Sequence, residues 1–374
     1  MIKSKKLLTV LVGLSIAMVG CNSTTNSESN TDLSSTNSEN SIIESNSESS
    51  SSSNSDIESN SASSSNSSSS STESSSSTSS DSEIENNTFD VDLDALKLQY
   101  GEFNIVTEKG TPGVLSEDKT TYTIEVSSSK SSYTISGYFN GQIIINNASN
   151  LTSFKGVELT LNNACLVSDS GSTIEYQVDE KNVEVIAKKG TENYIINTSE
   201  GSNDCAISSN KNVEIDGKGV LNILTKTGHG IKADSKIRIY EAPTINITSN
   251  HDALHSTSFI SNNEEEAEKD YKEFTGILNV LSASSQAFDC TNNKGTGSIT
   301  ITSGTYNISN CESVFKTDAT LYINSTVTAN NISLEPVVIG EKSNTLSIQI
   351  TENGSFTIDG VNYSQTVIGN TTVE

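Results

Sequence analysis

The chain has 374 residues, of which 22 are basic and 47 are acidic, and its formal net charge is −25 at pH 7. Nucleic acids and anionic bilayers attract basic protein surfaces, so this charge argues against both as direct partners. Tryptophan is absent and aromatic residues make up only 5% of the chain, which excludes a tryptophan platform for stacking a ligand.

Residues 1–21 have the pattern of a targeting segment. Three lysines precede the apolar run Leu7–Val19, and the small residue Gly20 comes directly before Cys21. This ending resembles the lipobox of bacterial lipoproteins, which implies that Cys21 is lipidated and becomes the first residue of the mature protein. The alternative is an ordinary secretory signal. We therefore expect an extracellular protein on the bacterial cell surface, which touches the membrane only through its N-terminal lipid.

Residues 22–88 consist almost entirely of Ser, Asn, Thr, Glu and Asp. They include eleven acidic residues and no lysine or arginine. Such a composition cannot bury enough apolar surface to offset the entropy lost on ordering. We predict a disordered, Ser-rich tether that holds the following domain away from the membrane.

Residues 89–374 are predicted to form one all-β domain with 19 basic and 36 acidic residues, a net charge of −17. Asp92–Tyr100 is expected to be a short amphipathic helix that caps the open end of this domain. Short runs of alternating apolar residues then predict strands. They lie at Tyr122–Val126, Tyr133–Ile135, Gln142–Ile145, Val157–Leu161, Ile174–Val178, Val183–Ala187 and Tyr194–Ile196.

A repeat follows, in which a large apolar residue lies between a small and a polar residue. This apolar residue is Ile207, Ile231, Leu254, Phe288 and Phe315, at intervals of 24, 23, 34 and 27 residues. A period in the twenties that is built from short strands predicts a solenoid. The intervals leave no room for helical crossovers, so we predict a parallel β-helix.

The one long interval contains the polar insertion Asn262–Glu273, which we expect to project from one coil as a loop or short helix. At the C-terminal end, Leu346–Ile350 and Ser355–Ile358 are predicted to form a closing hairpin or cap. Cys165, Cys205, Cys290 and Cys311 occupy different positions of the repeat, which favours free, partly buried thiols over disulfides.

An asparagine lies between two inward apolar residues in four successive repeats. These residues are Asn222, Asn246, Asn279 and Asn307. In parallel strands about 4.8 Å apart they would form an outward ladder. Stacked amides stabilise such a ladder without any ligand, but the same face could also serve as the floor of a glycan site.

Several runs together resemble the bacterial cell-surface carbohydrate-binding domain proteins, whose fold is a right-handed parallel β-helix like that of pectate lyases. The resemblance covers about residues 120–330 and is carried by Tyr133–Gly137, Gly141–Ile145, Val157–Asn162, Ile215–Ile223 and Gly228–Lys232. It implies that the protein binds extracellular polysaccharide, either of plant type or acidic. It also implies that calcium is held along the helix.

Members of that family typically repeat Asp-Gly-Ile-Lys in coil after coil, whereas the aspartate column here reads Cys205, His229, Asp252, Gln286 and Ser313. Calcium takes six to eight oxygen ligands, and one carboxylate of five puts a calcium row in doubt. We expect at most one calcium ion, held by Asp252 with help from Asp234 and Asp289. The alternative is that these are solvated carboxylates at turns.

The three histidines, His229, His251 and His255, fall at the turn region of adjacent coils. They could be plain polar turn residues, part of a patch that grips sugar hydroxyls, or a metal or acid–base site. Nine residues are predicted to bind carbohydrate. They are His229, Lys232, Tyr240, Asp252, His255 and the four ladder asparagines.

Three function classes remain open: a monomeric binding module without catalysis, a polysaccharide lyase, and an adhesive or structural stalk. A lyase needs a base near the sugar C5 atom and a cation that neutralises the uronate. Lys232, Arg238 and Lys316 are the candidates for these roles in the repeats. We predict the binding module.

Overall fold

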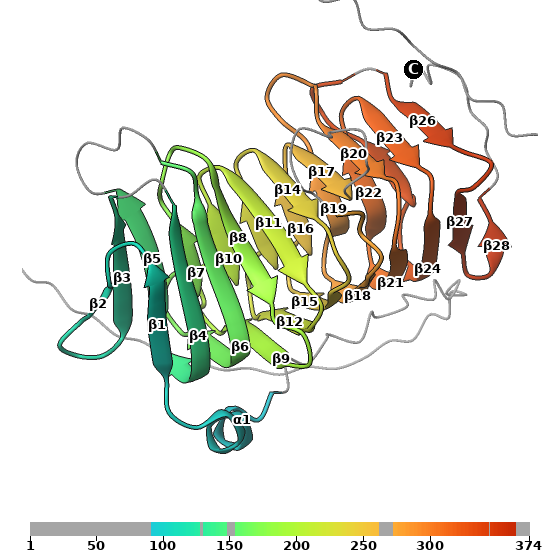
Figure 1. Ribbon diagram of the computed structural model, residues 1–374. Coiled ribbons are helices and arrows are strands. Elements are labelled where there is room, and N and C mark those ends of the chain that lie inside the picture. Colours follow the sequence, from blue (N-terminus) through green and yellow to red (C-terminus); the bar gives the residue numbers. More distant parts are fainter. Residues whose placement is uncertain (1–90, 128–129, 148–153, 262–271, 344, 364–374) are drawn as a thin grey trace, which may run out of the picture. The chain divides into compact units, whose positions relative to one another are not determined.

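Short strands follow one another in a repeating order along the chain (Figure 1). The computed structural model describes residues 91–127, 130–147, 154–261, 272–343 and 345–363. These residues all belong to one compact unit. The predicted signal segment with Cys21, the whole predicted tether 22–88 and most of the predicted insertion lie outside the described residues.

The strands form three parallel faces, and the chain visits them in turn. Face 1 contains β8 (Asn182–Ala187), β11 (Asn212–Gly217), β14 (Lys236–Ile239), β17 (Ser258–Ser261), β20 (Ser298–Ile301), β23 (Thr320–Ile323) and β26 (Ser347–Ile350). Face 2 contains β9 (Glu192–Asn197), β12 (Val220–Thr225), β15 (Thr244–Ser249), β18 (Ile277–Ala283), β21 (Thr305–Cys311), β24 (Thr326–Ile332) and β27 (Ser355–Ile358).

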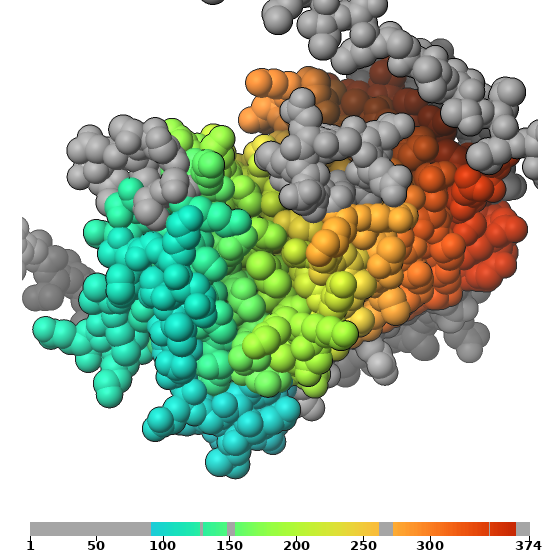
Figure 2. Space-filling model, in the orientation of Figure 1, coloured from blue at the N-terminus to red at the C-terminus, as the bar shows by residue number. Residues whose placement is uncertain are grey.

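Face 3 is a separate sheet, in which the antiparallel strand β2 (Val114–Leu115) is added at the N-terminal edge. Its parallel strands are β3 (Thr121–Val126), β5 (Gln142–Asn147), β7 (Ile174–Tyr176), β10 (Ile207–Ser209), β13 (Ile231–Ala233), β16 (Leu254–Ser256), β19 (Gln286–Cys290), β22 (Ser313–Thr317) and β25 (Val337–Ile339). Every third strand of the regular coils returns to the same face. This winding is compatible with the predicted β-solenoid, and the coils follow one another without a gap from blue to red (Figure 2).

Faces 1 and 2 join through two long strands, β4 (Ser131–Asn140) and β6 (Val157–Ser168), which run across both. Their pairing shifts register between Ile135 and Gly137. Gly137 has φ 80° there, and a Cβ atom on it would lie 1.8 Å from the carbonyl oxygen of Glu102. Glycine is therefore required where the strand bends from one face to the next.

The core lies between the three faces and is one continuous apolar cluster from Tyr122 to Phe356. The predicted repeat is confirmed, because Ile207, Ile231, Leu254, Phe288 and Phe315 are register partners in successive strands. The alternation on face 1 is confirmed as well. Its inward residues, such as Val213 and Ile215, have no exposed surface, as strand periodicity requires.

The ends of the solenoid differ from the prediction. The helix α1 (Leu93–Tyr100) forms with Asp92 as its N-cap. It packs, however, on the outside of face 2, where the apolar residues Cys165, Val167 and Ile196 need cover. The open end is covered instead by β1 (Asn104–Lys109), which pairs antiparallel with β4.

At the other end, β26 and β27 do not pair with each other. Each extends its own face in parallel, so of the two predicted forms, a hairpin or a cap, the hairpin is wrong. The closing antiparallel pair is β27 with β28 (Val361–Asn362). The four cysteines of the described residues are free and buried, as predicted. The only helix described, α1, has eight residues, so none there is long and apolar enough to cross a membrane.

Candidate functional site

The outer surface of face 3 presents one side chain from each coil in a single row. Parallel pairing aligns Ser208 with Lys232, Lys232 with His255, His255 with Asp289, and Asp289 with Lys316. The residues on either side of each point inward and are buried. Chemically different groups are therefore brought next to one another at the spacing of adjacent strands.

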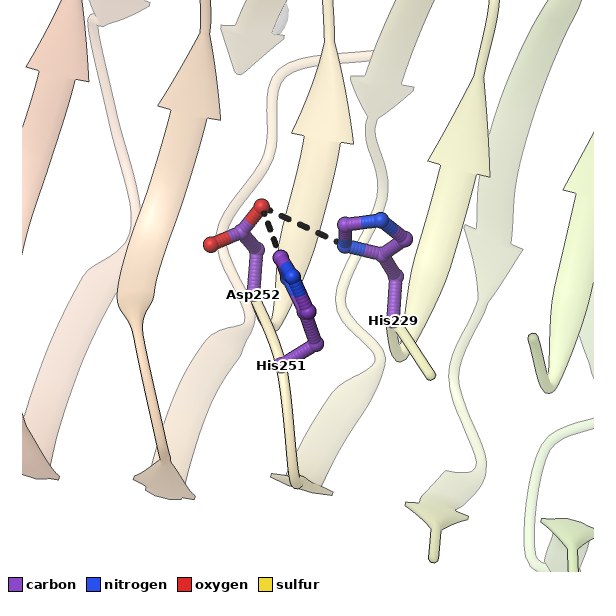
Figure 3. Close-up of side chains that lie close together, drawn as sticks. All are labelled: His229, His251 and Asp252. Atoms are coloured by element: carbon purple, nitrogen blue, oxygen red, sulfur yellow. Dashed lines mark ion pairs between the residues drawn. The ribbon is translucent and has the colours of Figure 1, made fainter. Parts of the chain in front are cut away.

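Three histidines meet the carboxylate of Asp252 beside this row. The Oδ2 atom of Asp252 lies 3.2 Å from Nδ1 of His229, 3.3 Å from Nδ1 of His251 and 3.0 Å from Nδ1 of His255. His229 comes from the turn before β13, and His251 and Asp252 come from the turn before β16 (Figure 3). All three histidines of the chain thus converge on one carboxylate, in what we call the Asp252 cluster.

Burial sets the electrostatics of the Asp252 cluster. Asp252 is 1% exposed, and its other oxygen, Oδ1, accepts the backbone N–H of Gln286 at 3.1 Å. Burial alone raises the pKa of Asp252, but the three histidines outweigh it and hold this pKa well below its usual range. Burial lowers the pKa of His229, whereas the hydrogen bond with Asp252 raises the pKa of His251.

An open cleft of about 460 Å³ adjoins the row on face 3. It is lined by polar and charged groups, which are Asp234, His255, Ser256, Thr257, Asp289, Thr291, Asn292, Asn293, Lys316, Asp318, Glu341 and Lys342, and by Ala233. The ammonium of Lys316 donates to Oδ2 of Asp289 at 3.0 Å, and the hydroxyl of Thr291 donates to Oδ1 of Asp289 at 2.7 Å. Burial alone lowers the pKa of Lys316, but the bond to Asp289 and the negative charges of Asp289, Asp252 and Glu341 together more than offset it, so the pKa is raised.

The buried residue Asp318 shapes one wall of the cleft. Its Oδ2 atom accepts the backbone N–H of Asn292 at 2.7 Å and that of Gly297 at 3.2 Å. Asp318 has no exposed surface. Its carboxylate therefore holds the loop 292–297 in place, and that loop carries two of the amide side chains that line the cleft.

The three carboxylates predicted to hold calcium do not fit that ion. Asp252 and Asp289 lie with His255 within one cluster, in which the ligand atoms are within 4.8 Å of one another, but Asp234 belongs to no such cluster of the described residues. The oxygens of Asp289 face a lysine and a threonine, and one oxygen of Asp252 faces three imidazoles. Calcium prefers a cage of six to eight oxygens.

The other predicted residues are divided among the faces. The four ladder asparagines lie on face 2. There the Nδ2 atoms of Asn246, Asn279 and Asn307 each donate at 2.8 Å to the Oδ1 atom of the preceding asparagine. The predicted ladder is confirmed, and it ends where Asn222 donates to Oε1 of Glu192 at 3.1 Å. A role for it in glycan binding stays a prediction.

Tyr240 and Arg238 lie on face 1, away from the cleft. Tyr240 is 5% exposed and its hydroxyl donates to Oε1 of Glu184 at 2.5 Å, so its ring offers no open surface for stacking a sugar. Arg238 pairs with Glu214 at 3.5 Å. Of the three residues named for a lyase, only Lys232 and Lys316 share the outer row of face 3.

Sequence reasoning missed a row of carboxylates on face 1. Glu158, Glu184 and Glu214 occupy adjacent register positions in β6, β8 and β11. Burial raises the pKa of Glu184 to about 7, and the neighbouring carboxylates act in the same direction. The signal was present in the sequence, because each glutamate lies between two inward apolar residues in the same triplet, as in Val183-Glu184-Val185.

A comparison with protein families gives one match for this chain. The model of a family described as "carbohydrate-binding domain-containing protein" matches residues 117–373, which include all three faces and the cleft. No curated protein and no solved structure matches the chain.

Proposed function

Because the chain belongs to the family of carbohydrate-binding domain-containing proteins, we propose that it binds a polysaccharide in the cleft on face 3. The observation that supports this location is the polar lining of the cleft. Carboxylates, amides and two ammonium groups line one open space of about 460 Å³. That volume lies within the range of small-ligand pockets, so it suits a short stretch of a longer chain.

The chemistry of the lining suits sugar hydroxyls. A hydroxyl both donates and accepts a hydrogen bond. Asp234 and Asp289 supply acceptors, Lys316 supplies a donor, and the amides of Asn292 and Asn293 supply both. Recognition in this cleft would therefore depend on hydrogen bonds rather than on stacking, in keeping with a chain that has no tryptophan.

The finer parts of the proposal rest on the sequence. The ligand is an extracellular polysaccharide, of plant type or acidic. The protein is a monomer, anchored at the bacterial cell surface by a lipid on Cys21 and held away from the membrane by the tether 22–88. We also propose that the β-helix is right-handed like that of pectate lyases, which is the usual hand of connections between parallel strands.

We propose binding without catalysis. The separation of Arg238 on face 1 from Lys232 and Lys316 on face 3 supports this choice over a lyase. In addition, the ammonium group of Lys316 is held by Asp289, and its raised pKa makes it a poor base at neutral pH. The stalk without a ligand site is the remaining alternative.

The test incubates the full chain with homogalacturonan, xylan and cellulose, and reads retention and the absorbance of unsaturated products from the same tubes. Lys316→Ala is expected to lower retention about tenfold, since one charged donor in a binding site contributes about 1.5 kcal/mol or more. Lys294→Ala is the matched control, because Lys294 is exposed and does not line the cleft.

Retention on one glycan that falls in Lys316→Ala and not in Lys294→Ala would support the proposal. Equal retention by both variants would move the site away from face 3. No retention on any glycan would favour the alternative function, a structural stalk without a ligand site. A rise in absorbance would make the protein a lyase.

A further inference from the structure

Three donor atoms from two neighbouring turns meet at one point of the Asp252 cluster. Nδ1 of His229 and Nδ1 of His251 lie 3.2 and 3.3 Å from Oδ2 of Asp252. The ligand atoms of these three residues all lie within 4.8 Å of one another. Ligands at about 2.1 Å from a tetrahedral ion are about 3.4 Å apart, so the two distances to Oδ2 of Asp252 match those between ligands of a bound metal ion.

Hydrogen bonds alone do not account well for one atom of this cluster. The side chain of His229 is 9% exposed, and its Nδ1 atom lies 3.2 Å from Oδ2 of Asp252 without the alignment of a good hydrogen bond. Buried polar atoms in proteins almost always have a partner. A metal ion between His229 and Asp252 would accept the lone pair of this nitrogen.

The surroundings of Asp252 orient its carboxylate as those of a metal ligand are oriented. Its Oδ1 atom accepts the backbone N–H of Gln286 at 3.1 Å, which directs Oδ2 toward the histidines. Hydrogen bonds of this kind from outside the ligand set fix the orientation of metal-binding carboxylates. His255, with Nδ1 3.0 Å from the same Oδ2 atom, stands next to the three ligands.

We propose that His229, His251 and Asp252 form a binding site for a divalent transition-metal ion of the zinc class, with the fourth position taken by His255 or water. Imidazole and carboxylate together suit zinc and its neighbours in the first transition row, whereas calcium and magnesium prefer oxygen alone. The three ligands do not line the proposed glycan cleft, whereas His255 does, so the two sites adjoin at His255. The proposed ion also differs in class from the calcium that the family resemblance implied.

The test uses the full chain after treatment with a chelator and desalting. Titration calorimetry with zinc chloride is expected to show one site, and calcium chloride is expected to show no competition for it. Cobalt(II) in place of zinc should give the visible absorption of a four-coordinate ion with nitrogen and oxygen ligands. His251→Ala is expected to weaken zinc binding by about 100-fold or more, since even the partners of metal ligands contribute 10- to 100-fold.

His251 is chosen because its side chain is 47% exposed and its loss leaves the core intact. Asn250→Ala is the matched control, a neighbour on the same turn that is not a candidate ligand. Zinc binding that survives in His251→Ala, or cobalt absorption typical of thiolate ligands, would overturn the proposal, the latter by pointing to the four buried cysteines. Displacement of zinc by calcium would overturn the assigned ion class.

Discussion

Glu184 is a carboxylate held between two others on face 1. Glu158 and Glu214 are its register neighbours. Those two have cations of their own, Lys130 and Arg238, whereas Glu184 forms no ion pair in the described part of the chain and receives only the hydroxyl of Tyr240. Burial and like charges both favour the protonated form, which explains why its pKa is raised to about 7.

This raised pKa makes stability depend on pH. The folded protein holds the proton of Glu184 more tightly than the unfolded chain does. The contribution of protonated Glu184 to the free energy of unfolding is therefore fully present below about pH 4.5 and is lost as the pH rises through about 7. The shift corresponds to about 3 kcal/mol, which solvent screening at this partly exposed side chain reduces to on the order of 2 kcal/mol.

Between about pH 5 and pH 8, we expect the unfolding free energy of the wild type to fall by on the order of 2 kcal/mol relative to that of Glu184→Gln. Urea unfolding of both proteins at each pH measures the difference. If the two proteins keep a constant difference in unfolding free energy, Glu184 is already ionised at pH 5 and its environment is more polar than its burial implies.

At the scale of single residues, the sequence predicted which side chains lie in neighbouring coils but not which way those side chains point. It placed the three histidines in neighbouring coils, and it placed His255 beside Lys232 in the row. It did not predict that all three rings turn toward Asp252, because the backbone path of each turn and the side-chain rotamers decide that. The burial of Tyr240 was also hidden, since it depends on contacts between distant coils.

Asp318 gives the first prediction at the scale of an element, the loop 292–297. Asp318→Ala removes the acceptor of two backbone N–H groups. Leaving one buried and one half-buried donor without a partner costs about 3 kcal/mol, so we expect the melting temperature and glycan retention to fall together. Faster amide hydrogen exchange at Asn292 and Gly297 would locate the effect.

Asp318→Asn serves as the control for this loop, because it keeps one acceptor oxygen. It should lose less stability than Asp318→Ala. Equal losses in the two variants would show that the charge of Asp318, rather than its hydrogen bonds, holds the loop.

The asparagine ladder is a second element in which the parts depend on one another. Its amides all donate in one direction and end on the carboxylate of Glu192. Hydrogen bonds in such a chain polarise one another, and the last one is charge-assisted. Asn246 takes part in two amide–amide bonds and Asn307 in one, so the two residues form a matched pair.

We expect Asn246→Ala to lower the free energy of unfolding by about 2 kcal/mol and Asn307→Ala by about 1 kcal/mol or less, at about 1 kcal/mol for each bond. Urea midpoints measure both. Glycan retention should be unchanged, since the cleft is on face 3. Reduced retention with unchanged stability would instead make the ladder part of a glycan site.

At the scale of the whole domain, charge opposes an acidic ligand. Residues 89–374 carry a net charge of −17, and the field of such a domain repels uronates at low ionic strength. Salt screens this repulsion. If the ligand is homogalacturonan, we expect retention to rise severalfold between about 0.02 M and about 0.3 M sodium chloride, where the Debye length falls below about 10 Å.

Retention of a neutral glycan, such as xylan without acidic side groups, should hardly change over the same range. Homogalacturonan that is released by added salt would contradict this expectation. It would show that local cations such as Lys316 and Lys342 dominate over the charge of the domain.

The sequence predicted the winding of the coils because a solenoid repeats the same inward positions in each coil. The anchors from Ile207 to Phe315 could be aligned by eye, and they are register partners. Prediction from the sequence failed at the two ends of the domain, where the repeat stops. The position of α1 depends on an apolar patch on face 2, and the parallel pairing of β26 depends on β23, which no local pattern reveals.

The outer row of face 3 has a consequence for the evolution of specificity. Each coil contributes one outward side chain, and the inward residues on either side of it maintain the fold independently. Substitutions from Ser208 to Lys316 can therefore change the order of charges along the row while the core stays the same. Gain or loss of a whole coil would lengthen or shorten the row by one position, so a lineage could match glycans of different length and charge on one framework.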